Sequence, residues 1–126
     1  MLKLLAALAA ALGLHTAAQA ASPLDALAPD YVRLLLEVGE HDEGYIDAYT
    51  GPPDWQAQAK ARKRQIPAVR ADVEALGRRI SGVPATALDP MERRRRAAML
   101  ADLKAAQVRL DPVSYTHLTL PTIYSV

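Results

Sequence analysis

The sequence predicts an all-α fold of short helices with an antiparallel helical hairpin, of the kind expected for a fragment of a larger helical protein. Three observations lead to this prediction. Alanine is the most frequent residue of the 126-residue chain and phenylalanine is absent, a composition that favours helix over sheet. Apolar residues recur at helical spacing in several stretches. Residues typical of helix starts and stops bound these stretches.

Residues 1–20 have the pattern of a signal peptide. Lys3 supplies a positive charge, residues 4–14 form an uncharged run rich in leucine and alanine, and residues 18–20 read Ala-Gln-Ala, a small-x-small cleavage site. A membrane anchor is the alternative, but a helix needs about 20 apolar residues to span a bilayer. We therefore expect an exported mature protein, periplasmic or extracellular, with no stable membrane insertion after cleavage.

The mature chain is expected to begin with two short helices. Residues 22–25, Ser-Pro-Leu-Asp, place a capping serine, a proline and an acid where a helix starts. Pro29 should interrupt this helix because it lacks an N–H group. Asp30 can then cap a second helix that runs to about Val38 and stops at Gly39. The apolar face of the second helix is expected to comprise Tyr31, Leu34, Leu35 and Val38.

Residues 40–44, Glu-His-Asp-Glu-Gly, form an acidic turn. Imidazole and carboxylate groups are metal ligands, so a metal site is one interpretation. However, consecutive side chains point in different directions, the His-x-x-x-His pair of zinc hydrolases is missing, and the chain has no cysteine. We therefore expect a solvated turn in which His41 caps the end of the preceding helix. No catalytic, cofactor-binding or metal-binding residue is assigned in this chain, and no cofactor is expected in it.

Most aromatic residues lie between residues 31 and 55. The chain has five tyrosines and one tryptophan, and this stretch holds the aromatic block of Tyr31, Tyr45, Tyr49 and Trp55. One buried aromatic side chain removes about 150–250 Å² from water, so we expect the aromatic block to be the nucleus of the core. A short amphipathic helical turn is predicted at residues 45–49 and should end at residues 51–53, Gly-Pro-Pro. Asp54 can then cap an exposed, weakly packed helix over residues 55–64.

The second half of the mature chain predicts the helical hairpin. Pro67 starts a helix that ends near Gly82, with a buried stripe at spacings of 3, 4, 3 and 4 residues: Ile66, Val69, Val73, Leu76 and Ile80. Asp89 caps a helix that runs to about Arg109. Its main apolar residues are expected to be Leu100, Leu103, Val108 and Leu110. The loop over residues 81–88 is short, so these two helices should pack antiparallel.

Charge is unevenly distributed along the mature chain. Residues 25–54 contain eight acidic residues and one basic residue, a net charge of −7, whereas residues 55–112 contain thirteen basic and six acidic residues, a net charge of +7. We expect the two halves to attract each other and to help dock the hairpin on the aromatic block. Residues 93–96 are four consecutive arginines. Consecutive helical residues point to all sides of a helix, so we expect a solvated surface and no nucleic-acid partner.

Residues 113–126 differ abruptly from the rest of the chain, because they contain no charged residue and no alanine. The run Val-Ser-Tyr-Thr-His-Leu, followed by Thr-Leu-Pro-Thr, resembles the translation of a transposase-end sequencing adapter. A native edge strand is the alternative. We expect residues 112–126 to be a non-native tail, and residues 21–111 to be the helical N-terminal region of a larger domain whose C-terminal part is missing.

Four motifs in the mature chain form a recognisable pattern. They are residues 30–34 (Asp-Tyr-Val-Arg-Leu), 39–42 (Gly-Glu-His-Asp), 45–49 (Tyr-Ile-Asp-Ala-Tyr) and 51–53 (Gly-Pro-Pro). The pattern resembles the N-terminal region of a bacterial family of long helical proteins related to the domain-of-unknown-function 885 zinc peptidases, although Thr50 stands where that family usually has a tyrosine. The family's metal motif, a His-Glu pair followed by Pro-Gly-His-His, has no match in this chain. The resemblance therefore implies a zinc-dependent hydrolase only for the full-length parent.

Two functions follow as expectations. In the first, the chain is the N-terminal, non-catalytic helical portion of an exported metallopeptidase-like hydrolase, and its partner is the missing C-terminal part of the same chain. In the second, it is a small exported helical module that binds a partner through the aromatic block. The sequence contains no catalytic set, so enzymatic activity is expected only of the full-length parent.

We predict that export removes residues 1–20. N-terminal sequencing of exported material should begin at Ala21, because the small-x-small site directly precedes this residue. An Ala20→Trp variant is the control, since a bulky residue next to the cut should leave the leader attached. Wild-type material that is exported but still begins at Met1 would contradict the prediction.

Overall fold

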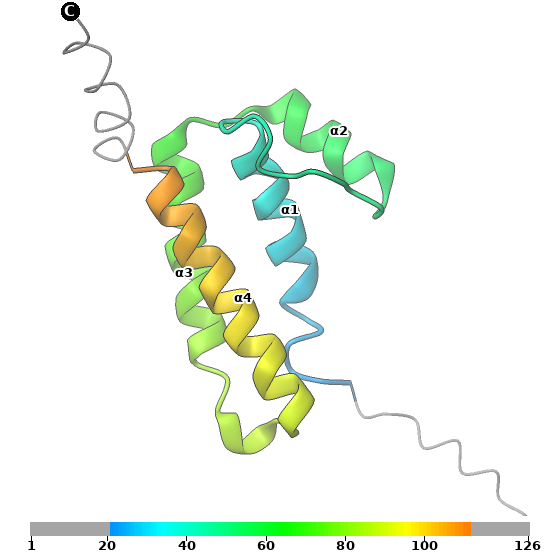
Figure 1. The fold of residues 1–126 in the computed structure, drawn as a ribbon, viewed down its shortest axis with the longest axis vertical. Helices are drawn as coiled ribbons and strands as arrows, with labels where there is room; N and C mark the ends of the chain where they lie inside the picture. Colours follow the sequence, from blue (N-terminus) through cyan, green and yellow to red (C-terminus); the bar gives the residue numbers. More distant parts are fainter. Residues whose placement is uncertain (1–20, 112–126) are drawn as a thin grey trace, which may run out of the picture.

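The computed structural model of the protein describes residues 21–111 (Figure 1). Within this range the chain forms four α-helices and one short 3₁₀ helix. Their bounds are α1 Ala28–Gly39, α2 Pro53–Arg62, α3 Ile66–Ser81, η1 Ala85–Ala87 and α4 Pro90–Arg109. No β-strand occurs among the described residues, which confirms the all-α prediction. The expected signal peptide and the adapter-like tail lie outside the described residues.

α3 and α4 form the predicted antiparallel hairpin, with η1 in the loop that joins them (Figure 1). α1 packs beside this pair, and the three helices enclose the core. α2 packs mainly on α1. The chain leaves α4 at the end of the hairpin at which α3 begins (Figure 1). None of the described helices is long and apolar enough to cross a membrane.

Aliphatic side chains, rather than aromatic ones, form the core. The buried cluster consists of Leu24, Leu27, Leu34, Val38, Val69, Val73, Leu76, Ile80, Leu88, Met99, Leu103, Ala106 and Leu110. The prediction of an aromatic nucleus is wrong, because no residue of the aromatic block is fully buried. Tyr31 and Tyr45 pack only against the edge of the cluster. A tyrosine must keep its hydroxyl near a polar partner, and Tyr31 does so by donating to Asp102 Oδ2.

α1 begins earlier than predicted, and Pro29 does not interrupt it. Pro29 lies in the first turn of the helix, where a backbone N–H would have no acceptor within the helix, so its missing N–H costs nothing. Asp30 is therefore not the cap of a new helix, and Leu27 holds the N-cap position. The helix ends at Gly39, as predicted.

The segment before α1 is a capped turn instead of a full helix. The Leu24 N–H donates to Ser22 Oγ at 3.2 Å, and the Ser22 N–H donates to Asp25 Oδ2 at 3.0 Å. This reciprocal pattern is the predicted capping box with aspartate in place of glutamate. It directs Leu24 and Leu27 into the core, where 0% and 8% of their surfaces are exposed.

The loop over residues 40–52 contains no helix, so the predicted helical turn at residues 45–49 is wrong. Gly44 has a φ of 83°, a left-handed conformation that lies outside a right-handed helix and that glycine adopts most easily. A helix of so few residues also nucleates poorly. The ring of Tyr49 closes the loop by lying where a Cβ on Gly51 would be placed.

α2 is exposed, as predicted, and only Ala59 among its residues is buried. Its N-cap is Pro52, and Asp54 lies in the first turn without a side-chain capping bond, so the predicted cap is wrong. The Arg33 guanidinium of α1 lies 4.5 Å from the ring centroid of Trp55. This cation–π contact joins α2 to α1 where the apolar packing between them is sparse.

The hairpin follows its predicted stripes with two exceptions. The residues Val69, Val73, Leu76 and Ile80 are buried, but Ile66 is 38% exposed because it is the first residue of α3, at the open end of the hairpin. In α4 the buried positions are Met99, Leu103, Ala106 and Leu110, whereas Val108 is 56% exposed. Val108 lies between the buried residues Ala106 and Leu110 in the sequence, and the helical repeat therefore turns its side chain away from the core. The cap of α4 is confirmed, since Asp89 Oδ1 accepts from the Glu92 N–H at 2.8 Å.

We predict that Gly77→Ala raises the free energy of unfolding by about 0.5–1 kcal/mol, because glycine is less stable than alanine in a helix interior. Gly77 lies inside α3, and a Cβ there meets no atom within 4 Å. Urea denaturation of the mature chain measures the change. Gly39→Ala is the matched control, since its Cβ would lie 3.3 Å from Ile46 Cδ1, and it should gain less. An equal or larger gain at Gly39 would contradict this account.

Candidate functional site

Ion pairs join the acidic first half of the described chain to its basic second half, as the charge distribution predicts. Five pairs cross between the halves: Arg62–Glu37, Arg64–Glu37, Arg79–Asp30, Arg95–Asp25 and Arg109–Asp42. An exposed ion pair stabilises a protein by only about 0–1 kcal/mol. The pair of Glu37 with Arg64 differs from the others because Glu37 is buried.

Glu37 is the one charged residue in the range 21–111 that is classed as buried, with 7% of its surface exposed. Both of its carboxylate oxygens accept from Arg64, at 2.9 Å from Nε and 2.6 Å from Nη2. Arg64 Nη1 also donates to Asp72 Oδ2 at 2.7 Å. These hydrogen bonds, to Glu37 first and to Asp72 second, raise the pKa of Arg64. A bidentate pair fixes orientation as well as distance, so Arg64 joins α1 to the first turns of α3.

The backbone around Arg64 is held as firmly as its side chain. Lys63, the C-cap of α2, has a φ of 30°, a left-handed conformation that costs a non-glycine residue about 1–2 kcal/mol. Its N–H donates to the Ala59 carbonyl at 3.0 Å. His41 Nε2 lies 2.6 Å from the Arg64 carbonyl oxygen. The prediction that His41 caps α1 is therefore wrong, because its ring reaches the link between α2 and α3.

The acidic turn does not bring its own side chains together. His41 bonds to the Arg64 carbonyl, whereas Asp42 pairs with Arg109 of α4. Over residues 21–111 no group of three or more His, Cys, Asp or Glu side chains is placed to hold a metal ion. The expectation that this chain holds no catalytic residue and no cofactor stays a prediction.

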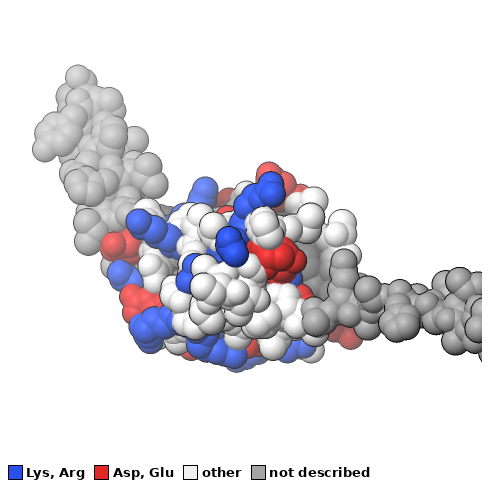
Figure 2. All heavy atoms as spheres, turned by 90° about the horizontal axis from the view of Figure 1, so that it is seen from below, with Lys and Arg blue, Asp and Glu red and all other residues white. Residues whose placement is uncertain are grey.

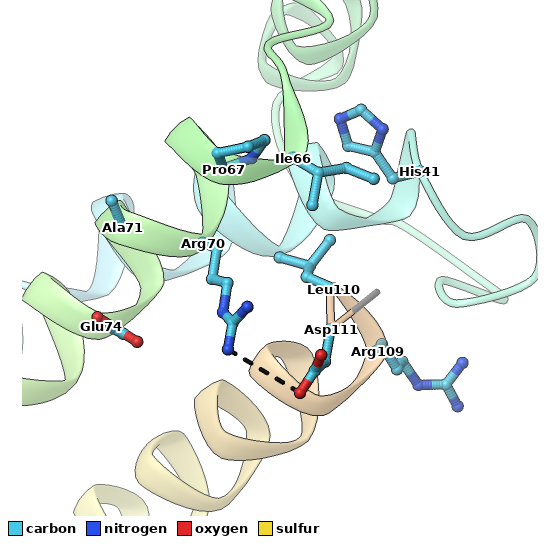
Figure 3. Close-up of a pocket in the computed structure, with 9 residues that line it drawn as sticks. All are labelled: His41, Ile66, Pro67, Arg70, Ala71, Glu74, Arg109, Leu110 and Asp111. Carbon is cyan, nitrogen blue, oxygen red and sulfur yellow. Dashed lines mark ion pairs between the residues drawn. The ribbon is translucent and has the colours of Figure 1, made fainter. Parts of the chain in front are cut away.

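An apolar pocket lies between the start of α3 and the end of α4 (Figure 3). It has a volume of about 630 Å³ and is lined by His41, Ile66, Pro67, Arg70, Ala71, Glu74, Arg109, Leu110 and Asp111. Figure 3 shows Ile66, Pro67 and Leu110 close together. Leu110 is only 3% exposed, whereas Ile66 is 38% exposed. The core therefore closes one side of the pocket, and Ile66 presents aliphatic surface to solvent on the other.

Both arginines that line this pocket are paired with carboxylates. Arg70 Nη2 lies 4.0 Å from Asp111 Oδ2, the ion pair drawn in Figure 3. Arg109 turns away from Leu110 in the same view. It pairs with Asp42, and its Cζ lies 5.1 Å from the ring centroid of Tyr45. The middle of the pocket is thus aliphatic, and it suits an apolar group better than a charged one.

Sequence reasoning placed Ile66 in the core and did not identify this pocket. A signal was present, because Ile66 precedes Pro67 at the first turn of the helix. An apolar residue in the first turn of a helix stays exposed when the neighbouring helix does not reach far enough to cover it.

A second, more open groove runs beside α1 and the loop over residues 40–52. Its volume is about 590 Å³ and its lining comprises Val32, Leu35, Leu36, Tyr45, Ile46, Asp47, Ala48, Tyr49 and Asp102. Burial raises the pKa of Tyr45, and burial followed by the hydrogen bond to Asp102 raises the pKa of Tyr31. The groove itself offers the half-buried rings of Tyr45 and Tyr49 beside aliphatic side chains.

The four consecutive arginines of α4 do not gather on one face. The Nε atom of Arg93 donates to the carbonyls of Ala85 and Leu88, both at 3.0 Å, while Arg95 pairs with Asp25. Arg96 donates to the last carbonyls of α3. On the face shown in Figure 2, blue side chains lie around the edge and are interrupted by red and white ones. These arginines hold the hairpin loop and the segment before α1 in place.

Comparison of the chain with protein-family models, with curated proteins and with solved structures gives no match. The resemblance of the four sequence motifs to the zinc-peptidase-related family therefore stays a prediction. They lie in α1, in the loop after it and at the start of α2.

We predict that Arg64→Ala lowers the free energy of unfolding by about 2 kcal/mol, between the 0–1 kcal/mol of exposed pairs and the 3–5 kcal/mol lost when a buried partner is removed. The substitution leaves the buried carboxylate of Glu37 with only Arg62, whose Nη1 is 3.9 Å away. Urea denaturation at neutral pH measures the loss. The double variant Glu37→Leu with Arg64→Met should recover most of it. A loss below about 0.5 kcal/mol would place the pair among surface ion pairs.

Proposed function

We propose that residues 21–111 are the N-terminal, non-catalytic helical portion of an exported metallopeptidase-like hydrolase. On this proposal the described helices supply packing surface, while the C-terminal part of the same polypeptide supplies the zinc site and the reaction. The observation that carries the proposal is the apolar pocket between α3 and α4, which opens beside Leu110 and Asp111, where the chain leaves α4.

The four motifs that resemble the zinc-peptidase-related family have structural roles here, which supports a non-catalytic portion. Leu34 is buried in the core, and Gly39 ends α1. His41 bonds to the carbonyl of Arg64, and the ring of Tyr49 packs against Gly51. These residues fix the path of the chain from α1 through the loop to α2.

The alternative is a small exported helical module that binds a partner through the aromatic block. The groove beside Tyr45 and Tyr49 favours it, because tyrosine rings beside aliphatic side chains are typical of binding surfaces. Trp55 is less suited to such a role, since Arg33 already stacks on its ring. A variant with Tyr45→Ala and Tyr49→Ala should lose the partner under this alternative alone.

The deciding experiment reads the uncontaminated gene past Asp111 and expresses the encoded protein. We expect a longer reading frame with a His-Glu zinc motif, and a purified product that contains zinc and hydrolyses peptides. A chelator should abolish the hydrolysis, and added zinc should restore it. The mature chain, residues 21–126, is the control and should show neither zinc nor activity. A native stop codon near Pro112 would contradict the proposal and favour the binding module.

A further inference from the structure

The pocket between α3 and α4 opens where the chain leaves the described fold. Leu110 is the C-cap of α4, and its N–H donates to the Ala106 carbonyl at 3.0 Å. The Asp111 N–H donates to the Val108 carbonyl at 3.2 Å, and the Asp111 side chain pairs with Arg70 of α3. These contacts hold Leu110 and Asp111, the last described residues, at the edge of the pocket (Figure 3).

From this geometry we infer that the pocket is the docking site for the segment that directly follows Pro112 in the uninterrupted gene, and that this segment presents an apolar helical face to it. The inference rests on the proposed function, in which the chain continues. It identifies the surface that the continuation covers, and it specifies that the continuation presents apolar side chains to that surface.

The chemistry of the pocket selects an apolar occupant. Ile66, Pro67, Ala71 and Leu110 supply its aliphatic surface. Arg70 and Arg109 are held by Asp111 and Asp42, so neither offers an uncompensated charge to an incoming group. Glu74 also lines the pocket, but it lies away from Ile66 and Leu110 (Figure 3). Covering the exposed part of Ile66 removes aliphatic surface from water, which favours association.

Covalent attachment favours the following segment over a separate protein. A segment joined through a short link to the edge of a site has an effective concentration in the millimolar range. The pocket is about 630 Å³ in volume, enough for a few aliphatic side chains from one helix. Helices that meet in this way bury a stripe of residues at helical spacing, and Ile66 and Leu110 provide the surface that such a stripe contacts.

The test compares the mature chain, residues 21–126, with the mature chain extended by its genomic continuation. Ile66→Lys introduces a charge into the pocket. It should lower the melting temperature of the extended chain by about 4 °C or more beyond its effect on the shorter chain. Ala71→Glu changes a second exposed position in the pocket and should also lower the melting temperature of the extended chain more than that of the shorter chain. Agreement between the two variants excludes a local effect at the start of α3.

Met91→Lys is the matched control, because Met91 is also an apolar residue in the first turn of a helix and is 74% exposed. It should change the melting temperatures of both chains equally. Hydrogen exchange provides a second readout. Backbone amides of residues 69–71 and 110 should be better protected in the extended chain, and Ile66→Lys should remove that extra protection.

Equal effects of Ile66→Lys on the two chains, with unchanged exchange at the pocket, would overturn the inference. A concentration-dependent dimer that Ile66→Lys dissociates would also overturn the inference, because a second copy of the chain would then occupy the pocket. Zinc content and peptide hydrolysis of the extended chain are measured in parallel. Docking without zinc-dependent hydrolysis would support the inference while refuting the proposed function, and hydrolysis without docking would do the reverse.

Discussion

The bidentate ion pair between Glu37 and Arg64 is the interaction on which the arrangement of the first three helices depends. It places a buried carboxylate of α1 against a guanidinium from the link between α2 and α3. A buried charge is tolerated only when it is paired and hydrogen-bonded, so α1 and the start of α3 can pack together only in a register that brings these two groups into contact. The third contact of Arg64, to Asp72, extends the same constraint along α3.

Apolar packing and charge pairing have different roles in this molecule. The aliphatic cluster between α1, α3 and α4 supplies the stabilising burial. The ion pairs then act at the edges: Arg95 reaches Asp25 before α1, Arg79 reaches Asp30 in its first turn, and Arg109 reaches the loop after it. Individually these exposed pairs contribute little. Together they align the acidic and basic halves and leave few charges to form a single basic or acidic surface.

Two hollows among residues 21–111 expose apolar side chains in different surroundings. The groove beside Tyr45 and Tyr49 is open and borders a loop that is closed by its own contacts. The pocket beside Ile66 and Leu110 borders the exit of the chain and is aliphatic at its centre. The second hollow lies beside Asp111, from which the continuation that we propose would extend.

The sequence by itself determined the helices that carry long, regular signals. The cap at Asp89, the stop at Gly39 and the stripe of α3 all depend on local geometry, which neighbouring residues specify. It also determined the attraction between the halves, since net charge is a property of composition. The expectation that this chain holds no catalytic residue also comes from the sequence, and it stays a prediction.

Only the tertiary structure decided which apolar residues form the core and which line the pocket. Tyr31 and Tyr45 have larger side chains than leucine, yet both pack at the edge of the cluster, where the Tyr31 hydroxyl donates to Asp102. Ile66 belongs to the same stripe as Val69 but lies at the open end of the hairpin, where no helix among the described residues covers it. His41 bonds to a carbonyl 23 positions away in the chain. Burial at a helix end and contacts between distant residues depend on how helices meet, which periodicity along one helix does not specify.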